Sequence, residues 1–399
     1  MYLERLELVD FRSFRSAELR CGPGVRVLVG ANAQGKTNLL EAVHYLATGS
    51  SHRVAGDGPL LRSGAEVAVI RADAQVSSRR LRVELELRPG GRARARLNGQ
   101  AQPRFRDAIG QIRSVLFAPE DLGLVHGDPA DRRRFLDDLL GQRRPAYLAA
   151  RQEYERIVRQ RNALLRSLRS GARGRAEPDD DSTLATWSAA LVQAGATLLA
   201  ARIAVVRALS APTESAYGDL VASSPVREAS GRVTLSYQLS TGRVVPAFEG
   251  SGVPDPAELA AELQDGIAAA AEAERERGLT LVGPHRDELL LALNEFPAKG
   301  YASHGEIWSL ALALRLASRD VLAEVGPEPV VLLDDVFAEL DERRRSRLAA
   351  RCSTFEQVLV TAAVDEDVPL DGPRHLVHAG TVTADPVGPG DLRDAEDLP

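Results

Sequence analysis

An α/β fold interrupted by a mainly helical insertion is predicted by three features of this 399-residue sequence. A complete phosphate-binding loop occupies residues 30–37, directly after an apolar strand pattern. A second apolar run, Val330–Leu333, ends in two aspartates near the other end of the chain. Between them, from about 127 to 278, the apolar spacing is mainly helical. Two halves of one nucleotide site therefore flank a long insertion, which predicts an ATPase head that carries an arm.

The loop contains the residue types that a phosphate site needs. Gly30 and Gly35 permit backbone conformations that turn successive N–H groups toward phosphate oxygens at the start of a helix. Lys36 supplies a point charge for the outer phosphates, and the Thr37 hydroxyl can ligate Mg²⁺. Residues 25–29 predict the preceding strand, and residues 38–46 the following helix. The predicted nucleotide-binding residues are Gly30, Ala31, Asn32, Ala33, Gln34, Gly35, Lys36 and Thr37.

The acidic strand is the predicted second half of this site. Val330–Leu333 is continuously apolar, as a strand buried on both faces should be, and strand ends present side chains to ligands. Asp334 is the predicted carboxylate ligand of Mg²⁺, and Asp335 the predicted general base or water-orienting group. On its own the pattern favours a buried strand with solvated acids at its end. Combined with the loop, it favours the nucleotide site.

A third motif, Ser303-His304-Gly305-Glu306, precedes an apolar helical pattern. Serine followed three residues later by glutamate forms a capping box, so a helix is expected to begin here. The amino end of a helix attracts an anion. A simple cap without a ligand is the alternative, and the motif alone favours it.

The chain divides into four predicted regions. Residues 1–126 form the first part of the head and contain a hairpin with one solvated face, built from residues 81–87 and 92–97. Residues 127–278 form the inserted arm, with helices expected over 130–140, 146–168 and 182–209 and a strand over 233–239. Residues 279–384 form the second part of the head, with strands at 279–282, 330–333 and 357–360 and helices at 306–325 and 342–350. Residues 385–399 are an acidic tail, which we expect to be disordered.

Lysine is nearly absent from this chain. It occurs only at positions 36 and 299, so arginine supplies almost all of the 50 basic residues. The planar guanidinium does not fit where a compact ammonium must lie among phosphates. The retention of Lys36 therefore favours a working site over a relic loop that still folds, and Lys299 is equally compatible with a solvated side chain and with a functional one.

The bulk composition excludes several classes of protein. A net charge of −6 argues against a uniformly basic nucleic-acid binder, so any DNA surface must be a local patch. Cys21 and Cys352 form neither a disulfide framework nor a metal cluster. The N-terminus lacks a signal-peptide pattern, and we expect no apolar run long enough to cross a bilayer. The expected location is a reducing cytoplasm.

Several motifs together resemble those of the RecF family, a group within the SMC and ABC-type ATPases. The resemblance spans most of the chain. The loop alone is typical of any P-loop protein, whereas the Gly283-Pro284-His285-Arg286-Asp287 motif and the Ser303 motif are specific to this family. The segments that match are 8–14, 30–46, 116–122, 132–137, 283–287, 303–306 and 334–341.

This resemblance implies an ABC/SMC-type head that binds ATP and Mg²⁺ and forms an ATP-dependent homodimer. The serine motif of one subunit would contact the γ-phosphate held by the other, and hydrolysis would separate the two heads. The residues expected to act in trans are Ser303, Gly305, Glu306 and Asp341. Arg12 and Asn38 would complete the nucleotide-binding set.

The sequence departs from the family pattern at three points. His304 and Glu306 stand where glutamine is frequent, and a carboxylate near a γ-phosphate would repel it unless it serves the capping box. Thr361 occupies the place of the ABC switch histidine, and Glu120 is the nearest substitute for the missing Q-loop glutamine. We therefore expect a weak, DNA-stimulated ATPase with Lys36, Asp335 and Thr361 as its catalytic residues.

The resemblance also implies gapped, single-stranded or duplex DNA as a ligand and a RecR-type mediator protein as a partner, in recombination, DNA repair and the SOS response. Arginines spaced by two share one face of a strand, and arginines are frequent phosphate contacts. Each group of arginines described below could equally well be a solvated charged surface with no ligand. The DNA-contact candidates are Arg92, Arg94 and Arg96 in the hairpin and Arg132, Arg133 and Arg134 in the arm.

Three alternative functions belong to other classes. A transporter motor would need a membrane partner and a Gly-Gly-Gln signature, which this sequence lacks. A small-molecule kinase would carry a short lid in place of the long arm. A scaffold with a degenerate site is the third, and ATP turnover with and without DNA would distinguish it from an ATPase.

Overall fold

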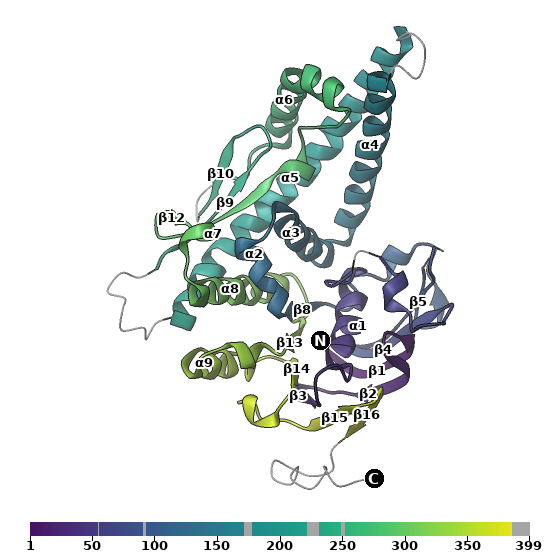
Figure 1. The fold of residues 1–399 in the computed structure, drawn as a ribbon, viewed down its shortest axis with the longest axis vertical. Coiled ribbons are helices and arrows are strands. Elements are labelled where there is room, and N and C mark those ends of the chain that lie inside the picture. The colour runs from purple at the N-terminus through teal and green to yellow at the C-terminus, as the bar shows by residue number, and fades with distance from the viewer. Residues whose placement is uncertain (55, 91–92, 171–177, 222–230, 249–251, 385–399) are drawn as a thin grey trace. The chain divides into compact units, whose positions relative to one another are not determined.

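The computed structural model describes residues 1–54, 56–90, 93–170, 178–221, 231–248 and 252–384 (Figure 1). By its internal contacts the chain forms two compact units. The first unit comprises Met1–Asp121, Asp219–Val221 and Ser318–Pro399, and the second comprises Leu122–Gly218 and Ala222–Ala317. Residues 279–317 therefore group with the predicted arm by contact. The functional boundaries predicted at 126, 278 and 384 stay a prediction, and the tail 385–399 lies outside the described residues.

A mainly parallel six-stranded sheet forms the centre of the first unit. Its strand order is β16-β15-β3-β14-β13-β8, and every neighbouring pair except β15 with β16 is parallel. All residues of β13 and β14 are buried, which confirms the apolar strands predicted at 330–333 and 357–360. The strands are β3 Gly24–Val29, β8 Ser114–Phe117, β13 Val330–Asp334, β14 Gln357–Ala362, β15 Arg374–His378 and β16 Thr381–Ala384.

A second, antiparallel sheet of the first unit has the order β2-β1-β4-β5-β6-β7. Its strands are β1 Tyr2–Phe11, β2 Phe14–Arg20, β4 Ala68–Val76, β5 Arg79–Leu87, β6 Arg94–Leu97 and β7 Gln100–Ala101. The pairing of β5 with β6 confirms the predicted hairpin and its alternation of buried apolar and solvated charged residues. Helices α1 Lys36–Thr48 and α9 Glu342–Cys352 follow the phosphate loop and the acidic strand.

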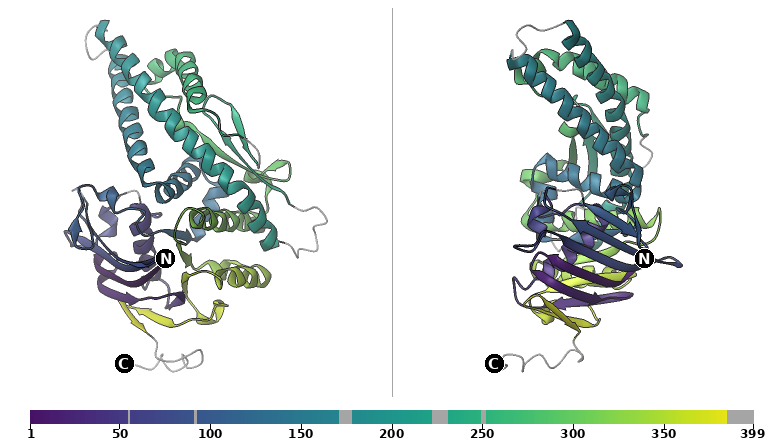
Figure 2. Two further views of the ribbon diagram at one scale, coloured as in Figure 1. Left: turned by 180° about the vertical axis from the view of Figure 1, so that it is seen from behind. Right: turned by 90° about the vertical axis from the view of Figure 1, so that its right-hand side faces the viewer.

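The second unit consists of helices and a small antiparallel sheet of order β10-β9-β11-β12. Helices α4 and α5 run side by side in both views of Figure 2. The strand predicted at 279–282 is wrong, because these residues form no strand and the sheet uses Glu288–Leu293 instead. The remaining bounds are α2 Leu122–His126, α3 Pro129–Arg143, α4 Pro145–Ser170, α5 Pro178–Val221, β9 Val233–Gln238, β10 Val244–Ala247, α6 Pro256–Arg277, β11 Glu288–Leu293, β12 Phe296–Pro297, α7 Ala298–Tyr301 and α8 His304–Ala323.

Helix α5 corrects one expectation from the sequence. Its segment Asp181–Val221 is long and apolar enough to cross a membrane by length and composition. The prediction that the chain contains no such run is therefore wrong. More than half of the most apolar window of this segment is buried inside the protein. Its Arg202 side chain is also buried, in an ion pair with Asp137. These features are typical of a core helix in a folded domain.

Candidate functional site

The phosphate loop connects β3 to α1, and its two glycines are sterically required. Gly35 has a φ of 108°, in the left-handed region, and a Cβ there would lie 2.8 Å from the Ser13 hydroxyl and from the Phe14 ring. A Cβ on Gly30 would lie 2.2 Å from the Val377 carbonyl oxygen. Neither position tolerates a side chain without displacing a neighbour. The sequence motif therefore reflects close packing as well as phosphate chemistry.

Lys36 is buried at the start of α1 with its ammonium group directed back at the loop. Its Nζ donates to the carbonyl oxygens of Gly30 at 2.6 Å and Ala31 at 3.1 Å. Ala31, Asn32 and Ala33 of the loop are exposed. The loop thus encloses a positive charge that no carboxylate neutralises among the described residues, which suits an anionic ligand.

The acidic strand meets the phosphate loop directly. The Thr37 hydroxyl donates to Asp334 Oδ1 at 3.0 Å, although the two residues are 297 positions apart. Strands β3, β14 and β13 are parallel neighbours, so their carboxyl ends bring the loop, Thr361 and Asp334 to one edge of the sheet. The two predicted halves of the site are therefore in contact within the first unit, and their joint role in nucleotide binding stays a prediction.

Thr361 holds both acids of this strand in place. Its hydroxyl donates to Asp334 Oδ1 at 2.7 Å and accepts a hydrogen bond from the Asp335 N–H at 3.0 Å. Asp335 has a φ of 50°, which is unusual for a residue other than glycine. The Thr361 side chain is buried, and its hydroxyl makes these two bonds and also lies 3.5 Å from the Leu333 carbonyl oxygen. Its predicted catalytic role stays a prediction.

Among the residues that the structure describes, no cationic side chain forms an ion pair with Asp334. Burial raises the pKa of Asp334, and the nearby Asp335 and Glu120 carboxylates add to the rise. Hydrogen bonds from Thr361 and Thr37 oppose it. An oxygen pair made of a carboxylate and a hydroxyl is a donor set that Mg²⁺ prefers. The residues present therefore fit a divalent cation at this point.

Arg12 and Asn38, the two nucleotide-binding candidates outside the loop, make contacts that the sequence did not predict. The guanidinium of Arg12 forms a two-pronged ion pair with Glu41, at 2.8 and 2.6 Å. Glu41 is fully buried in α1 and also accepts a hydrogen bond from Ser51. Asn38 donates to the Ser13 hydroxyl at 3.0 Å. A glutamate within the apolar helical pattern of residues 38–46 shows in the sequence that an acid could be buried there, but it does not identify Arg12 as the partner.

The Ser303 motif forms the predicted capping box in the second unit. The Ser303 backbone N–H and hydroxyl donate to Glu306 Oε2 at 2.9 and 2.8 Å. The Glu306 carboxylate is therefore held by the cap, and the amino end of α8 is exposed around Ser303 and His304. Asp341 in the first unit caps α9, accepting from the Arg344 N–H at 2.9 Å.

The DNA-contact candidates differ widely in exposure. Arg94 and Arg96 are exposed on one face of β6, opposite Glu86 and Glu84 of β5, and Arg96 lies 3.6 Å from Glu84. Arg92 lies outside the described residues.

In the arm, Arg132 is buried against Glu288 at 2.6 and 3.0 Å, so it is not available to a ligand. Arg133 donates to the Asp287 carbonyl at 2.7 Å, and Arg134 is exposed.

The family-specific motif at 283–287 lies in a buried polar network of the second unit. Arg202 pairs with both carboxylate oxygens of Asp137, at 2.9 and 3.0 Å, and donates to the Pro284 carbonyl at 2.6 Å. Tyr237 donates to Asp287 at 3.0 Å, and burial raises the pKa of Asp287 to about 6. Every one of these charged or polar groups has a partner, so the network holds α3, α5, β9 and the motif together.

The same motif includes a glycine at positive φ and a neutral histidine. His285 Nε2 donates to the Thr280 carbonyl at 3.1 Å, so its Nδ1 accepts from the Tyr154 hydroxyl at 2.7 Å. Burial lowers the pKa of His285 to about 4, which keeps the ring neutral. Gly283 has a φ of 136°, and a Cβ there would lie 2.3 Å from the Tyr154 hydroxyl. The residue types of the motif are thus explained by packing within the second unit.

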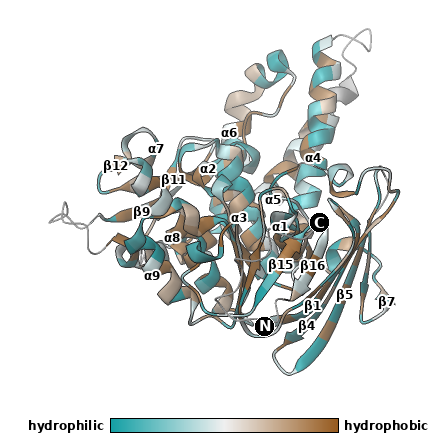
Figure 3. Cartoon of the chain, turned by 60° about the horizontal axis from the view of Figure 1, so that its bottom comes forward, coloured by the Kyte–Doolittle hydropathy of each residue, from teal (hydrophilic) through white to brown (hydrophobic). Residues whose placement is uncertain are grey.

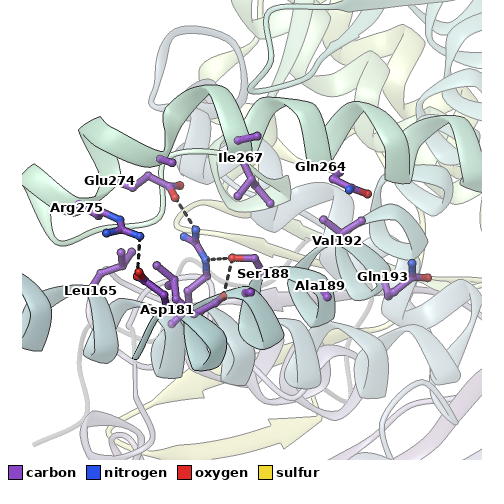
Figure 4. A pocket seen from close by; sticks show the side chains of 15 residues that line it. Leu165, Asp181, Ser188, Ala189, Val192, Gln193, Gln264, Ile267, Glu274 and Arg275 are labelled. Atoms are coloured by element: carbon purple, nitrogen blue, oxygen red, sulfur yellow. Dashed lines mark hydrogen bonds and ion pairs between the residues drawn. The ribbon is translucent and has the colours of Figure 1, made fainter. Parts of the chain in front are cut away.

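A cavity of about 430 Å³ lies between α4, α5 and α6 (Figure 4). Its polar floor is the buried ion pair of Arg161 with Glu274 at 2.6 Å, and Arg161 also donates to Ser188 and Thr280. The walls are mainly apolar, and Arg275 pairs with Asp181 at one end. The charged groups that line this cavity are therefore paired with one another.

Comparison with known proteins places this arrangement in a family. The chain matches the RecF/RecN/SMC N-terminal domain family over residues 2–369. A protein of Streptomyces avermitilis described as DNA replication and repair protein RecF is 51% identical over 96% of this chain and 99% of its own length. A protein of Frankia alni with the same description is 51% identical over the same shares.

Solved structures show the same fold. A structure of the recombination mediator protein RecF, described as RecF-ATPrS in the RecFOR pathway, has a TM-score of 0.84 and 24% identity over 96% of this chain and 98% of its own. An Smc head domain from Pyrococcus furiosus has a TM-score of 0.50 and 18% identity over 96% of each chain. These likenesses confirm the predicted class, an α/β head of the ABC/SMC type with an inserted helical arm. Taken with the nearly full-length similarity to its relatives, they show that the chain belongs to the RecF family.

Proposed function

We propose that this protein is an ATP-dependent DNA-binding protein of replication and recombinational repair that acts in the cytoplasm. The names of its relatives and the solved structures of RecF with ATP and ATPrS support the proposal. The observation that carries it is the 3.0 Å hydrogen bond between Thr37 and Asp334, because it joins the two motifs of a nucleotide site across 297 residues.

In this proposal the backbone N–H groups of residues 30–37 and the Lys36 ammonium bind the phosphates of ATP. Thr37 and Asp334 would hold Mg²⁺, which neutralises phosphate charge when bound. Asp335, at the end of the same strand, orients the attacking water. Thr361 fixes the positions of both aspartates, and hydrolysis is slow because this hydroxyl replaces the histidine expected in an ABC-type site.

ATP would join two copies of the chain. The amino end of α8 is exposed and carries the partial positive charge of a helix start, which suits the γ-phosphate held by a second copy. Glu306 is held by the Ser303 N–H and hydroxyl, which weakens its repulsion of that phosphate. Gly305 permits close approach, and Asp341 would contact the partner copy. The dimer would bind gapped DNA and act with a RecR-type mediator.

The test is the mass of the protein in solution, measured by light scattering with Mg²⁺ and ATP, with and without gapped DNA. The wild type should shift from monomer to dimer with ATP, and Ser303→Arg should bind ATP as a monomer yet fail to dimerise. Ser182→Arg, an exposed serine on α5, is the matched control and should dimerise. Persistent dimers of Ser303→Arg would contradict the trans role, and a wild type that stays monomeric with ATP would contradict the dimer itself.

A further inference from the structure

Helix α4 has two faces of opposite character. Its buried residues, Tyr154, Ile157, Arg161 and Leu165, lie on one side of the helix. The opposite side is exposed and polar, and α4 is largely teal where it is visible in Figure 3. This outer face is exposed at Arg159, and near the end of α4 its Arg166 and Arg169 contact the carboxyl end of α6 while remaining exposed.

Three arginines share the outer face of α4. Arg159, Arg166 and Arg169 are all exposed. At 100° per residue they fall within an arc of about 80°, and Arg159 and Arg166 are about 10 Å apart along the helix axis. We call these residues, together with Arg277 at the end of α6, the arm stripe.

Arg277 joins the stripe through direct contacts. Arg169 donates to the Arg277 carbonyl at 3.1 Å. A Cβ on the neighbouring Gly278 would lie 3.2 Å from Arg166 Cγ and 3.4 Å from Arg169 Nε, so these side chains surround the end of α6. Arginines from two helices thus gather at one place.

The arm stripe differs from the other arginines of its neighbourhood because none of its members forms an ion pair with a described carboxylate. Arg151 pairs with Glu155, Arg156 with Glu153, Arg161 with Glu274 and Arg275 with Asp181. Within the part of the chain that the structure describes, no ion pair joins a carboxylate to any residue of the stripe. In a chain of net charge −6, four unneutralised arginines form a marked local excess of positive charge.

Helix geometry explains only part of this excess. Helices α4 and α6 both end here, and cations near the carboxyl end of a helix are favourable by about 0.3–1 kcal/mol each. This effect is confined to the last turn, so it accounts for Arg169 and Arg277. Arg159 lies about three turns before the end of α4 and gains nothing from it. A polyanion that runs along the helix would contact all four.

We propose that the arm stripe binds the phosphate backbone of nucleic acid. The inference rests on the proposed function, and it assigns to the arm a DNA-contacting surface made of Arg159, Arg166, Arg169 and Arg277. The arm stripe takes the place of Arg132 and Arg133 as the expected DNA contact of the arm, because those two side chains are engaged with Glu288 and with the Asp287 carbonyl. Such contacts carry charge but no sequence information, so the stripe should bind duplex and gapped DNA without regard to sequence.

The test is the salt dependence of DNA binding in the presence of ATP and Mg²⁺. Fluorescence anisotropy with a labelled duplex is measured from 50 to 200 mM salt for the wild type and for the triple variant Arg159→Gln/Arg166→Gln/Arg169→Gln. Glutamine preserves helix propensity. The slope of log K against log salt is negative, and each lost phosphate contact should make it less steep by about 0.9. The triple variant should therefore lose about two to three units of slope and bind about tenfold or more weakly.

The control removes the same charge elsewhere in the second unit. Arg207→Gln/Arg232→Gln/Arg243→Gln should keep the slope of the wild type, since these arginines lie off the stripe. Equal slopes for the two triple variants would overturn the inference while leaving the proposed function intact. A stripe variant that binds DNA normally but loses an acidic partner protein would also overturn it. A wild type that fails to bind DNA with ATP would instead count against the proposed function.

Discussion

The phosphate site and the buried network around Arg202 and Asp137, which we call the arm network, both contain buried charged side chains. The two regions differ in how those charges are compensated. In the phosphate site, Lys36 donates to carbonyl oxygens and Asp334 accepts from hydroxyl groups, and neither forms an ion pair within the described part of the chain. In the arm network, Arg202 pairs directly with Asp137. Burying a charge is costly unless an opposite charge or a ligand compensates it. A buried charge without a counter-charge thus marks a ligand site, and a buried pair marks a structural contact.

The largest effect on stability is expected when one member of the Arg202–Asp137 ion pair, the arm pair, is removed. Arg202→Met leaves the Asp137 carboxylate buried without its main partner, which should lower the free energy of unfolding by about 3–5 kcal/mol. Denaturant unfolding measures this loss. The exposed substitution Arg207→Met, on the same helix, should change stability by less than about 0.5 kcal/mol.

A double variant sharpens this test. In Arg202→Met/Asp137→Leu the Asp137 carboxylate is removed together with its main partner, so part of the lost stability should return. If Arg202→Met were as stable as the wild type, the structural account of the arm pair would be wrong.

A smaller loss of stability is expected at Gly283. Gly283→Ala places a methyl group 2.3 Å from the Tyr154 hydroxyl at a φ of 136°, so unfolding should become easier by about 1–3 kcal/mol. Gly218→Ala is the matched control, because it lies exposed in α5 with nothing within 4 Å of the new methyl group. That substitution should stabilise the helix by about 0.5–1 kcal/mol. Equal effects at the two glycines would contradict the packing account of the family motif.

The smallest effect concerns pH and the phosphate site. The pKa of Asp334 is raised by burial, so Mg²⁺-dependent ATP binding should weaken as the pH falls through that raised value. Thr361→Val removes a hydrogen bond that lowers this pKa, so the loss should begin at a higher pH. At neutral pH the affinity should change by less than about tenfold. Thr361→Ser keeps the hydroxyl and should keep the wild-type profile, and identical profiles for the valine and serine variants would contradict the role of the hydroxyl.

The sequence predicted the parts of the molecule that short motifs encode. The loop, the acidic strand and the Ser303 capping box each lie within a few residues, so local spacing revealed them. The Arg12 pair with Glu41 and the Arg202 pair with Asp137 depend on residues 29 and 65 positions apart, and no local pattern specifies them. Arg132 was predicted to contact DNA for the same reason. Its burial against Glu288 depends on a residue far along the chain and cannot be inferred from a run of three arginines. The strand expected at 279–282 failed because an apolar run that short fits a loop equally well.

If Lys36 and Asp334 belong to one nucleotide site, they should affect ATP binding in different and predictable ways. Calorimetric titration with ATP, in the presence and absence of Mg²⁺, compares the wild type with Lys36→Ala, Asp334→Asn and the half-exposed control Asp367→Asn. Lys36→Ala should weaken ATP binding by at least about tenfold in either condition. Asp334→Asn should abolish only the contribution of Mg²⁺, and Asp367→Asn should behave as the wild type. An Asp334→Asn variant with the full Mg²⁺ dependence of the wild type would contradict the composite site.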